Sequence, residues 1–298
     1  VLRGHPDILV TDLHAVVDGS PVFDAWRRKN DVHFHQEAER RALGEAVAAT
    51  IRKALAKPAK QLPLPGESFT VAGRPAFLIL PENRDAAQPT PWVWYAPTLP
   101  NLPAAEERWM FGEFLAAGIA VAGIDVGESM GNPQGRAWFT ALHQELVANR
   151  GMSAKPCLLA RSRGGLMLYN WAAENPGSVA AIAGVYPVTN LASWPGLAKA
   201  APAYGITESE LAAELTRHNP VDRLEPLARA GIPIFHIHGD NDTVVPLATN
   251  SALVKQRYDQ LGGSMVLHII PGGGHDMKIH WFQSQELVDF VIRHCRGT

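Results

Sequence analysis

The feature that most constrains the fold is a series of short, almost wholly apolar runs separated by helical patterns. Strands that are apolar along their whole length are buried on both faces, as in a mostly parallel sheet covered by helices. The sequence therefore predicts an α/β fold with helices on both faces of its central sheet. The runs predicted as strands are Trp92–Ala96, Ile119–Ile124, Pro156–Ala160, Val179–Tyr186, Pro233–Ile237 and Met265–Ile270.

Helical spacing of apolar residues fills most of the intervals between these runs. Phe69–Val71 and Ala76–Leu80 precede the first run and favour an antiparallel pair joined by a turn at Gly73. The interval 189–225 carries additional helical patterning between two strands, which predicts a short helical cap. The other predicted helices are Ala104–Ala117, Pro133–Asn149, one that begins near Arg163, Leu247–Leu261 and Gln285–His294.

The composition of the chain changes near residue 58. The stretch Gln36–Lys57 is amphipathic at helical spacing, whereas residues 58–66 hold three prolines and a glycine. Proline fixes φ and removes a backbone donor, so this segment is typical of a linker or an extended strap. We expect an N-terminal helical extension over 1–57, a linker over 58–66 and the main domain over 67–298. Because Val1 stands where an initiator Met is expected, we also expect a processed or truncated chain.

Charge and composition exclude several classes of function. The 298 residues include 27 Lys and Arg against 29 Asp and Glu, a formal net charge of −2. This balance lacks the basic excess that binds nucleic acid or an anionic membrane. No apolar run reaches the ~18 residues of a membrane span. Two cysteines, Cys157 and Cys295, are too few for a disulfide framework. A small molecule is the expected partner.

The most informative segment is Leu158–Leu166, with the sequence Leu-Leu-Ala-Arg-Ser-Arg-Gly-Gly-Leu. Its serine, Ser162, follows an apolar run and precedes two glycines and a helix. A serine in this position lies on a tight strand-to-helix turn that projects its hydroxyl above the sheet. The free N–H groups of the helix start face a developing oxyanion there. Ala160 replaces the first glycine of G-x-S-x-G, and a small-residue turn of a doubly wound protein is the structural alternative.

Two later loops supply an acid and a histidine. The segment His238–Pro246 follows one predicted strand and contains Asp240 and Asp242, and a glycine-rich loop after the next strand contains His275. The carboxyl ends of parallel strands meet at one edge of a sheet, where open α/β proteins have their sites. The chain order serine, acid, histidine predicts a Ser-His-Asp triad for nucleophilic acyl chemistry.

Over about residues 67–298 these motifs resemble the α/β-hydrolase superfamily, particularly its prolyl-oligopeptidase-like and carboxylesterase branches. His238–Pro246 matches the H-G-x-x-D-x-x-V-P pattern of that family, which implies that Asp242, rather than Asp240, is the triad acid. The resemblance further implies an α/β-hydrolase fold with Ser162 as nucleophile and His275 as general base. It implies hydrolysis of short-acyl or carbohydrate-linked esters through an acyl-enzyme, with no cofactor or metal.

The resemblance also implies the oxyanion donors. The backbone N–H of Arg163 is the first donor. The second is expected in the loop after Trp92–Ala96, at Thr98 or Leu99, although the His-Gly pair of the family is absent there.

Four side chains are predicted to contact the substrate, and they are Arg163, Glu128, Tyr186 and Trp194. A Ser-Arg pair at the elbow is similar to that of glucuronoyl esterases, which act on uronic acid esters, and indicates an anionic substrate. The neighbouring Arg161 is instead expected to form a structural ion pair, with an acid such as Asp125 or Glu128.

Other interpretations of the same residues remain. A prolyl-oligopeptidase-type peptidase, an acyltransferase and a non-catalytic binding protein share the hydrolase motifs. His236-x-His238-x-Asp240 resembles part of a metallo-β-lactamase-type motif, but Asn241 stands where that motif has another His, so a packing role for His236 is favoured. Residues 30–33, with Asn30, Asp31 and His33, and the helix after them resemble the end of an SGNH hydrolase domain; a docked helical extension is the alternative.

Overall fold

The structure is a computed structural model that describes residues 37–55, 60–85 and 87–296. The chain divides into two units, Val1–Ala59 and Lys60–Thr298. In the first unit the structure describes helix α3 (Glu37–Leu55), which lies within the predicted amphipathic stretch Gln36–Lys57. Residues 30–33, which carry the resemblance to an SGNH hydrolase domain, lie outside the described residues.

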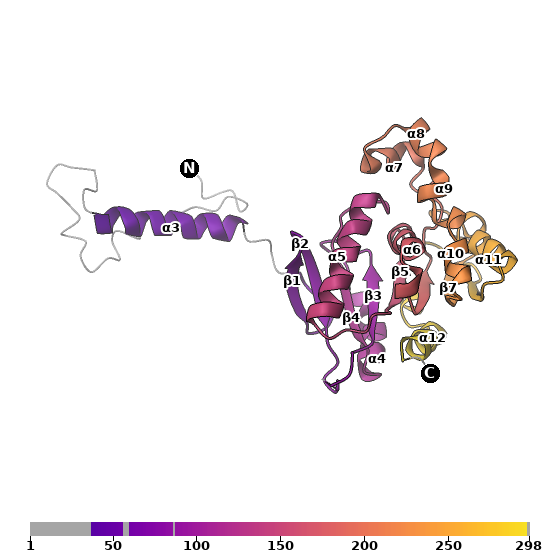
Figure 1. Cartoon of the computed structure of the whole chain (residues 1–298), viewed down its shortest axis with the longest axis horizontal. Coiled ribbons are helices and arrows are strands. Elements are labelled where there is room, and N and C mark those ends of the chain that lie inside the picture. The colour runs from indigo at the N-terminus through magenta and orange to yellow at the C-terminus, as the bar shows by residue number, and fades with distance from the viewer. Residues whose placement is uncertain (1–36, 56–59, 86, 297–298) are drawn as a thin grey trace. The chain divides into compact units, whose positions relative to one another are not determined.

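The described part of the second unit contains one eight-stranded sheet in the order β1-β2-β4-β3-β5-β6-β7-β8 (Figure 1). The β1–β2 and β2–β4 pairs are antiparallel and the other pairs are parallel, so the predicted hairpin and the mostly parallel sheet are confirmed. The strands are β1 (Glu67–Val71), β2 (Arg74–Ile79), β3 (Trp92–Ala96), β4 (Ala120–Ile124), β5 (Cys157–Arg161), β6 (Ala181–Val185), β7 (Ile234–Gly239) and β8 (Met265–Ile270).

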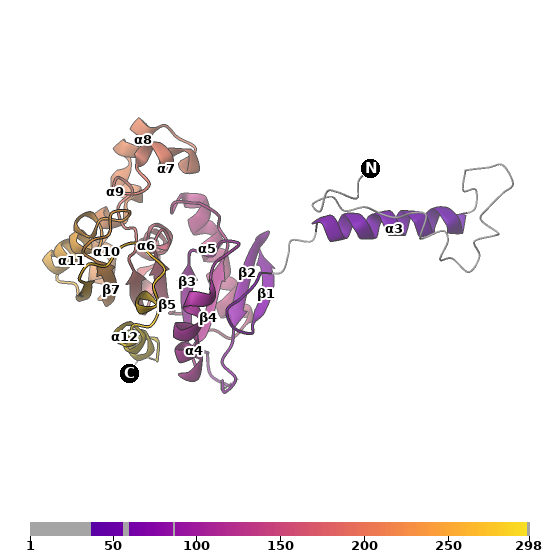
Figure 2. The ribbon, with the colours of Figure 1, turned by 180° about the vertical axis from the view of Figure 1, so that it is seen from behind.

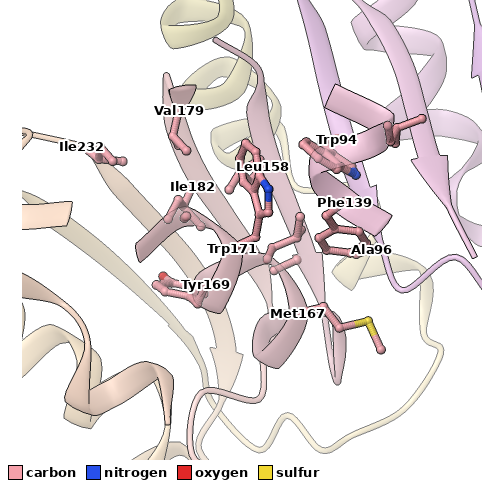
Figure 3. Close-up of a cluster of buried hydrophobic side chains, with 14 of the residues drawn as sticks. Trp94, Ala96, Phe139, Leu158, Met167, Tyr169, Trp171, Val179, Ile182 and Ile232 are labelled. Atoms are coloured by element: carbon pink, nitrogen blue, oxygen red, sulfur yellow. The ribbon is translucent and has the colours of Figure 1, made fainter. Parts of the chain in front are cut away.

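Helices cover both faces of the sheet because successive strand residues point to opposite sides. From β3, Trp94 enters the layer beneath α5 and α6, where its ring centroid lies 4.7 Å from that of Trp171 (Figure 3). The next residue, Tyr95, enters the opposite layer, beneath α4 (Arg108–Ala116) and α12 (Gln285–Arg296). Figure 2 shows these two helices in a view from behind. The helices are α4 (Arg108–Ala116), α5 (Pro133–Asn149), α6 (Gly164–Glu174), α11 (Ser251–Gln260) and α12 (Gln285–Arg296).

The interval between β6 and β7, where a cap is predicted, contains several short helices. Thr207 accepts a hydrogen bond from the Glu210 N–H, and the Glu210 side chain accepts one from the Thr207 N–H, a capping box that starts α8. In Figure 1, α7 and α8 are drawn at the top of the second unit, beyond the sheet. The helices are α7 (Leu197–Tyr204), α8 (Glu208–Ala213), α9 (Leu215–His218) and α10 (Glu225–Arg229).

Residues 60–66, at the start of the second unit, pack against the rest of it as a strap. Leu62 and Leu64 contact the apolar layer beneath α4, and Arg108 donates a hydrogen bond of 2.6 Å to the Pro63 carbonyl. Across residues 37–55, 60–85 and 87–296, no helix has the length and apolar character that crossing a bilayer requires.

Candidate active site

The turn between β5 and α6 holds Ser162 in a backbone conformation that L-residues rarely adopt. Its φ is +47°, in the left-handed region. The Ser162 N–H donates to the Val185 carbonyl at 3.0 Å, and the Ser162 carbonyl accepts from the Val188 N–H at 2.8 Å. A Cβ on Gly164 would lie 2.0 Å from the Ala96 carbonyl oxygen, so glycine is required there. The strained turn is therefore fixed by backbone hydrogen bonds and by close approach to the end of β3.

The serine, the histidine and the acid come from three different loops and meet at the carboxyl edge of the sheet. Ser162 Oγ lies 2.9 Å from His275 Nε2, and His275 Nδ1 lies 2.7 Å from Asp242 Oδ2. When Nδ1–H donates to the carboxylate, Nε2 of the neutral ring accepts the hydroxyl hydrogen of Ser162. This arrangement suits proton transfer from a nucleophilic hydroxyl.

Buried donors keep Asp242 ionised. Burial raises the pKa of this carboxyl, but hydrogen bonds from His238, His275 and the Val245 N–H lower it by more, so the pKa lies well below its usual range. Asp242 Oδ1 accepts the N–H groups of Val244 and Val245 at 3.0 and 2.8 Å. Asp240 is exposed and accepts the Gly272 N–H at 2.7 Å. Of the two candidate acids, the structure therefore brings Asp242 to His275.

Tyr186 lies behind His275. The two ring centroids are 4.3 Å apart, and the Tyr186 hydroxyl donates to the Asp276 carbonyl at 3.1 Å. Burial raises the pKa of Tyr186 to about 12, against the opposing effect of Arg161, so the phenol keeps its proton at neutral pH. Only 1% of Tyr186 is exposed, which leaves its ring little surface for the substrate contact that the sequence predicts.

Arg161 forms a buried ion pair, but with a partner that sequence reasoning missed. Its Nη1 lies 2.6 Å from Oε1 of Glu107, and the expected partners Asp125 and Glu128 pair with other arginines. Glu107 also accepts the Tyr95 hydroxyl at 2.7 Å. No motif surrounds Glu107; the only signal is an acid at the start of a predicted helix. The choice of acid in the sequence analysis was wrong, whereas the structural role of Arg161 is confirmed.

Arg163 and two other predicted substrate contacts form one cluster beside the nucleophile. The Arg163 guanidinium pairs with Glu128 and lies 5.5 Å from the ring centroid of Trp194. The Arg163 and Glu128 side chains are 35% and 46% exposed, so solvent and small molecules reach both. The Arg163 N–H is at the N-cap of α6, where an α-helix leaves donors without intrahelical acceptors.

The loop after β3 contains the two residues predicted as second oxyanion donor. Thr98 is buried and its hydroxyl donates to the Tyr95 carbonyl at 3.2 Å. The Leu99 carbonyl accepts the Leu102 N–H at 2.9 Å and a hydrogen bond from Lys60. Burial lowers the pKa of Lys60 to about 8, opposed by the nearby Asp125. Sequence reasoning gave Lys60 no role, and no spacing pattern connects it to this loop.

The two histidines of β7 converge, as residues two apart on a strand do, but on a serine rather than a metal. Nδ1 of His236 and Nδ1 of His238 lie 2.9 and 2.7 Å from Ser251 Oγ. Both rings are completely buried, which confirms the packing interpretation of His236. In the described part of the chain, no three His, Cys, Asp or Glu side chains gather as metal ligands would.

Solved structures with the same fold include esterases and a peptidase. A truncated carbohydrate esterase from gut microbiota has a TM-score of 0.60 and 18% identity, over 74% of this chain and 90% of that one. Est1E from Butyrivibrio proteoclasticus has a TM-score of 0.56 and 16% identity, over 78% and 99% of the two chains. Porphyromonas gingivalis dipeptidyl peptidase 4 has a TM-score of 0.58 and 16% identity, over 83% of this chain. At these identities the likeness establishes the fold alone.

The comparisons differ in the share of each relative that is covered. The chain spans 37% of the Porphyromonas peptidase, and 35% and 39% of the first two structures matched. A comparison with curated proteins finds no match. Residues 134–296, more than half of the chain, match the model of the prolyl oligopeptidase family. The chain belongs to that family and has an α/β-hydrolase fold.

Proposed function

We propose that the chain is a carboxylic ester hydrolase with Ser162 as nucleophile, His275 as general base and acid, and Asp242 as the group that orients His275. The observation that carries the proposal is the continuous line of hydrogen bonds from Ser162 Oγ through the imidazole to a buried carboxylate, at 2.9 and 2.7 Å. An alcohol is a weak nucleophile unless a base removes its proton, and this line supplies the base.

The proposed reaction has two halves. Ser162 Oγ attacks the ester carbonyl while its proton passes to His275 Nε2. The tetrahedral intermediate collapses, the C–O bond to the alcohol breaks, and the alcohol leaves with the proton from His275. Water then gives a proton to His275 and attacks the acyl-enzyme, which releases the acid and returns the proton to Ser162 Oγ. Asp242 stays ionised throughout.

The oxyanion of each tetrahedral intermediate needs preorganised donors. We assign one to the backbone N–H of Arg163 and the second to Thr98 or Leu99. The contact of Gly164 with the Ala96 carbonyl supports this assignment, because it brings the loop after β3 against the elbow. Loss of one such donor costs about 10²–10³ in kcat.

The cluster of Arg163, Glu128 and Trp194 is the proposed substrate contact. A half-buried aromatic ring beside charged hydrogen-bonding groups suits a sugar ring or a uronate. Arg163 is already paired with Glu128, so a substrate carboxylate would have to compete with Glu128 for the guanidinium. Sugar hydroxyls both donate and accept, so they can bind to the pair without breaking it. We therefore expect carbohydrate-linked esters to be better substrates than simple alkyl esters. Buried Tyr186 is assigned a different role, that of packing against His275.

Peptide hydrolysis is the second candidate, favoured by membership in the prolyl oligopeptidase family. The esterase proposal is preferred because the two esterases named above are matched over 90% and 99% of their own lengths. Acyl transfer and binding without catalysis are further alternatives that use the same fold.

The experiment is a matched substrate panel with wild type and Ser162→Ala. It compares p-nitrophenyl esters of C2 to C12 acids, acetylated sugars and uronate methyl esters with dipeptidyl p-nitroanilides. We expect ester cleavage by the wild type that is lost in Ser162→Ala. Preferential anilide cleavage would support the peptidase. Product partition toward an added alcohol would identify a transferase, and no turnover of any substrate would support a binding protein.

A further inference from the structure

We propose that His238 is a positioning residue for Asp242, and that a buried chain of hydrogen bonds through Ser251, His236 and Tyr169 holds the His238 ring in the orientation in which it acts. The inference rests on the proposed function, because it concerns the acid of the triad. The chain begins in the core beneath α6 and ends at the carboxylate that contacts His275.

Each link of the chain has hydrogen-bond geometry. The Tyr169 hydroxyl lies 2.7 Å from His236 Nε2, and His236 Nδ1 lies 2.9 Å from Ser251 Oγ. Ser251 Oγ is 2.7 Å from His238 Nδ1. His238 Nε2 in turn lies 2.8 Å from the Val245 carbonyl and 3.4 Å from Asp242 Oδ2. That carboxylate oxygen is the one that faces His275.

The two acceptors beside His238 Nε2 fix the direction of the whole chain. A carbonyl and a carboxylate only accept, so Nε2 must carry hydrogen, and Nδ1 of the neutral ring accepts the Ser251 hydroxyl hydrogen. Ser251 has one hydrogen, so its remaining contact must come from His236 Nδ1–H. His236 Nε2 is then an acceptor and takes the hydrogen of the Tyr169 hydroxyl. Every donor in this series of hydrogen bonds then faces an acceptor.

The opposite direction fails at its far end. A doubly protonated His238 would donate to Ser251, which would donate to His236, whose Nε2–H would donate to Tyr169. The hydrogen of the Tyr169 hydroxyl would then have no acceptor among the described residues, in a side chain that is 1% exposed. An unpaired buried donor is costly, so the first direction is the stable one.

The fold makes room for this chain and excludes water from it. His236, His238 and Ser251 are each completely buried. A Cβ at Gly184, the neighbour of His236 in the sheet, would lie 2.7 Å from the His236 ring, so glycine is needed beside it. Burial, with a smaller effect of His238, lowers the pKa of His236 to about 3, which keeps the ring neutral and able to accept.

The chain has a direct consequence for catalysis. The Ser251 hydroxyl holds the Nδ1 side of the His238 ring, so that the hydrogen on Nε2 points toward Asp242 Oδ2 and helps to hold it toward His275. If a link is lost, the Ser251 hydroxyl no longer holds the Nδ1 side of the His238 ring, and the ring can tilt. The Nε2–H would then be less well aligned with Asp242 Oδ2, and the carboxylate would be held less firmly toward His275.

The experiment compares two Tyr→Phe variants of the whole protein, each made as a single substitution. Tyr169→Phe removes the first donor of the chain. Tyr258→Phe is the matched control, since its buried hydroxyl donates to the Ile232 carbonyl at 2.6 Å, outside the chain. We expect similar losses of Tm for both. Only Tyr169→Phe should lower kcat on p-nitrophenyl acetate, by about threefold with KM unchanged, in line with one buried hydrogen bond.

Substitution of Ser251 should have a larger effect on kcat, which a conservative variant should reverse. Ser251→Ala breaks the chain next to His238 and should lower kcat about tenfold, as loss of a buried hydrogen bond predicts. Ser251→Thr keeps the hydroxyl and should restore kcat. The rate at which a fluorophosphonate modifies Ser162 should fall in the same order, independently of substrate.

Equal kcat for the two Tyr→Phe variants, or wild-type kcat in Ser251→Ala, would overturn the inference. The proposed function fails in a different way, by an absence of ester turnover and of Ser162 labelling in the wild type. If the wild type is active and kcat is unchanged in Tyr169→Phe and Ser251→Ala, the positioning role alone is refuted.

Discussion

Near the catalytic edge of the sheet, some polar side chains are buried and others are exposed to solvent. The two sets alternate along the same segments of the chain. Arg161 is 9% exposed and bound to Glu107, whereas Arg163, two residues later, has a side chain that is 35% exposed beside Glu128 and Trp194. Asp242 is 5% exposed, and Asp240 in the same loop is open to solvent. We call these sets the buried layer and the exposed layer.

This difference shows that burial, rather than residue type, decides the role of these groups. A charge in the buried layer has lost its water, so it depends on its partner and fixes the geometry around it. A charge in the exposed layer keeps much of its hydration, so its ion pair contributes little to stability and can open to a substrate. Changes in the buried layer should therefore alter kcat or stability, and changes in the exposed layer should alter KM.

The largest contrast is expected between the two aspartates. Asp242→Asn should lower kcat about 10⁴-fold, because an amide no longer holds the His275 ring in the tautomer that accepts the serine proton. Asp240→Asn should leave kcat within about twofold, since its exposed carboxylate accepts a hydrogen bond from the Gly272 N–H and not from His275. Steady-state kinetics on the best ester, with Tm as the folding control, checks both. Equal losses in the two variants would break the comparison.

The two arginines should differ in stability. Arg161→Ala leaves Glu107 buried without its cation and should reduce the free energy of unfolding by about 3–5 kcal/mol. Arg163→Ala removes a half-exposed pair and should cost less than ~1 kcal/mol. Urea denaturation of both variants is the measurement. A larger loss for Arg163→Ala would mean that the layers are wrongly assigned.

The pH dependence of stability should carry a contribution from the buried layer. The pKa of His236 is about 3 in the folded chain, so this ring stays neutral while the unfolded chain takes up a proton below its ordinary pKa near 6.5. Its contribution is complete above pH ~6.5 and is lost as the pH falls toward ~3, by up to about 1.4 kcal/mol per pH unit.

Urea denaturation at several pH values checks this, with the slope compared between wild type and His236→Gln. The variant is less stable at every pH, but its free energy of unfolding should fall less steeply between pH 6 and pH 4. Identical slopes would show that His236 is protonated in the folded chain.

The smallest effects are expected in the exposed layer. Arg163→Ala and Trp194→Ala should each raise KM about threefold to tenfold for uronate methyl esters, a loss of roughly 1 kcal/mol of contact energy. Trp138→Ala is the matched control, because Trp138 also lies against an arginine, Arg74, and is also half-buried. An unchanged kcat/KM for Arg163→Ala on both acetylated sugars and uronate methyl esters would remove Arg163 from the substrate contacts.

The fold was predictable because its signals are local. A run such as Pro156–Ala160 is apolar enough to require burial on both faces, and the small residues around Ser162 specify a tight turn. The loops that contain Asp242 and His275 follow strands whose parallel order brings their ends to one edge. Sequence alone therefore reached the residues that now lie within hydrogen-bonding distance of one another.

What the sequence did not reveal are contacts made across the fold. Glu107 reaches Arg161 from 54 positions away, and Ser251 meets His236 and His238 from the start of α11. Such pairs depend on which helix packs on which strand, and no residue spacing records that. The expected pairing of Arg161 failed for this reason, since the acids that were proposed, Asp125 and Glu128, pair with Arg74 and Arg163.

Covalent labelling of Ser162 tests the central claim most directly. The chain is treated with a fluorophosphonate, weighed by intact-mass spectrometry and mapped by peptide sequencing, beside Ser162→Ala under the same conditions. We expect one adduct per chain, located at Ser162 and absent from the variant. No adduct on the folded wild type, or undiminished labelling of Ser162→Ala, would contradict the account.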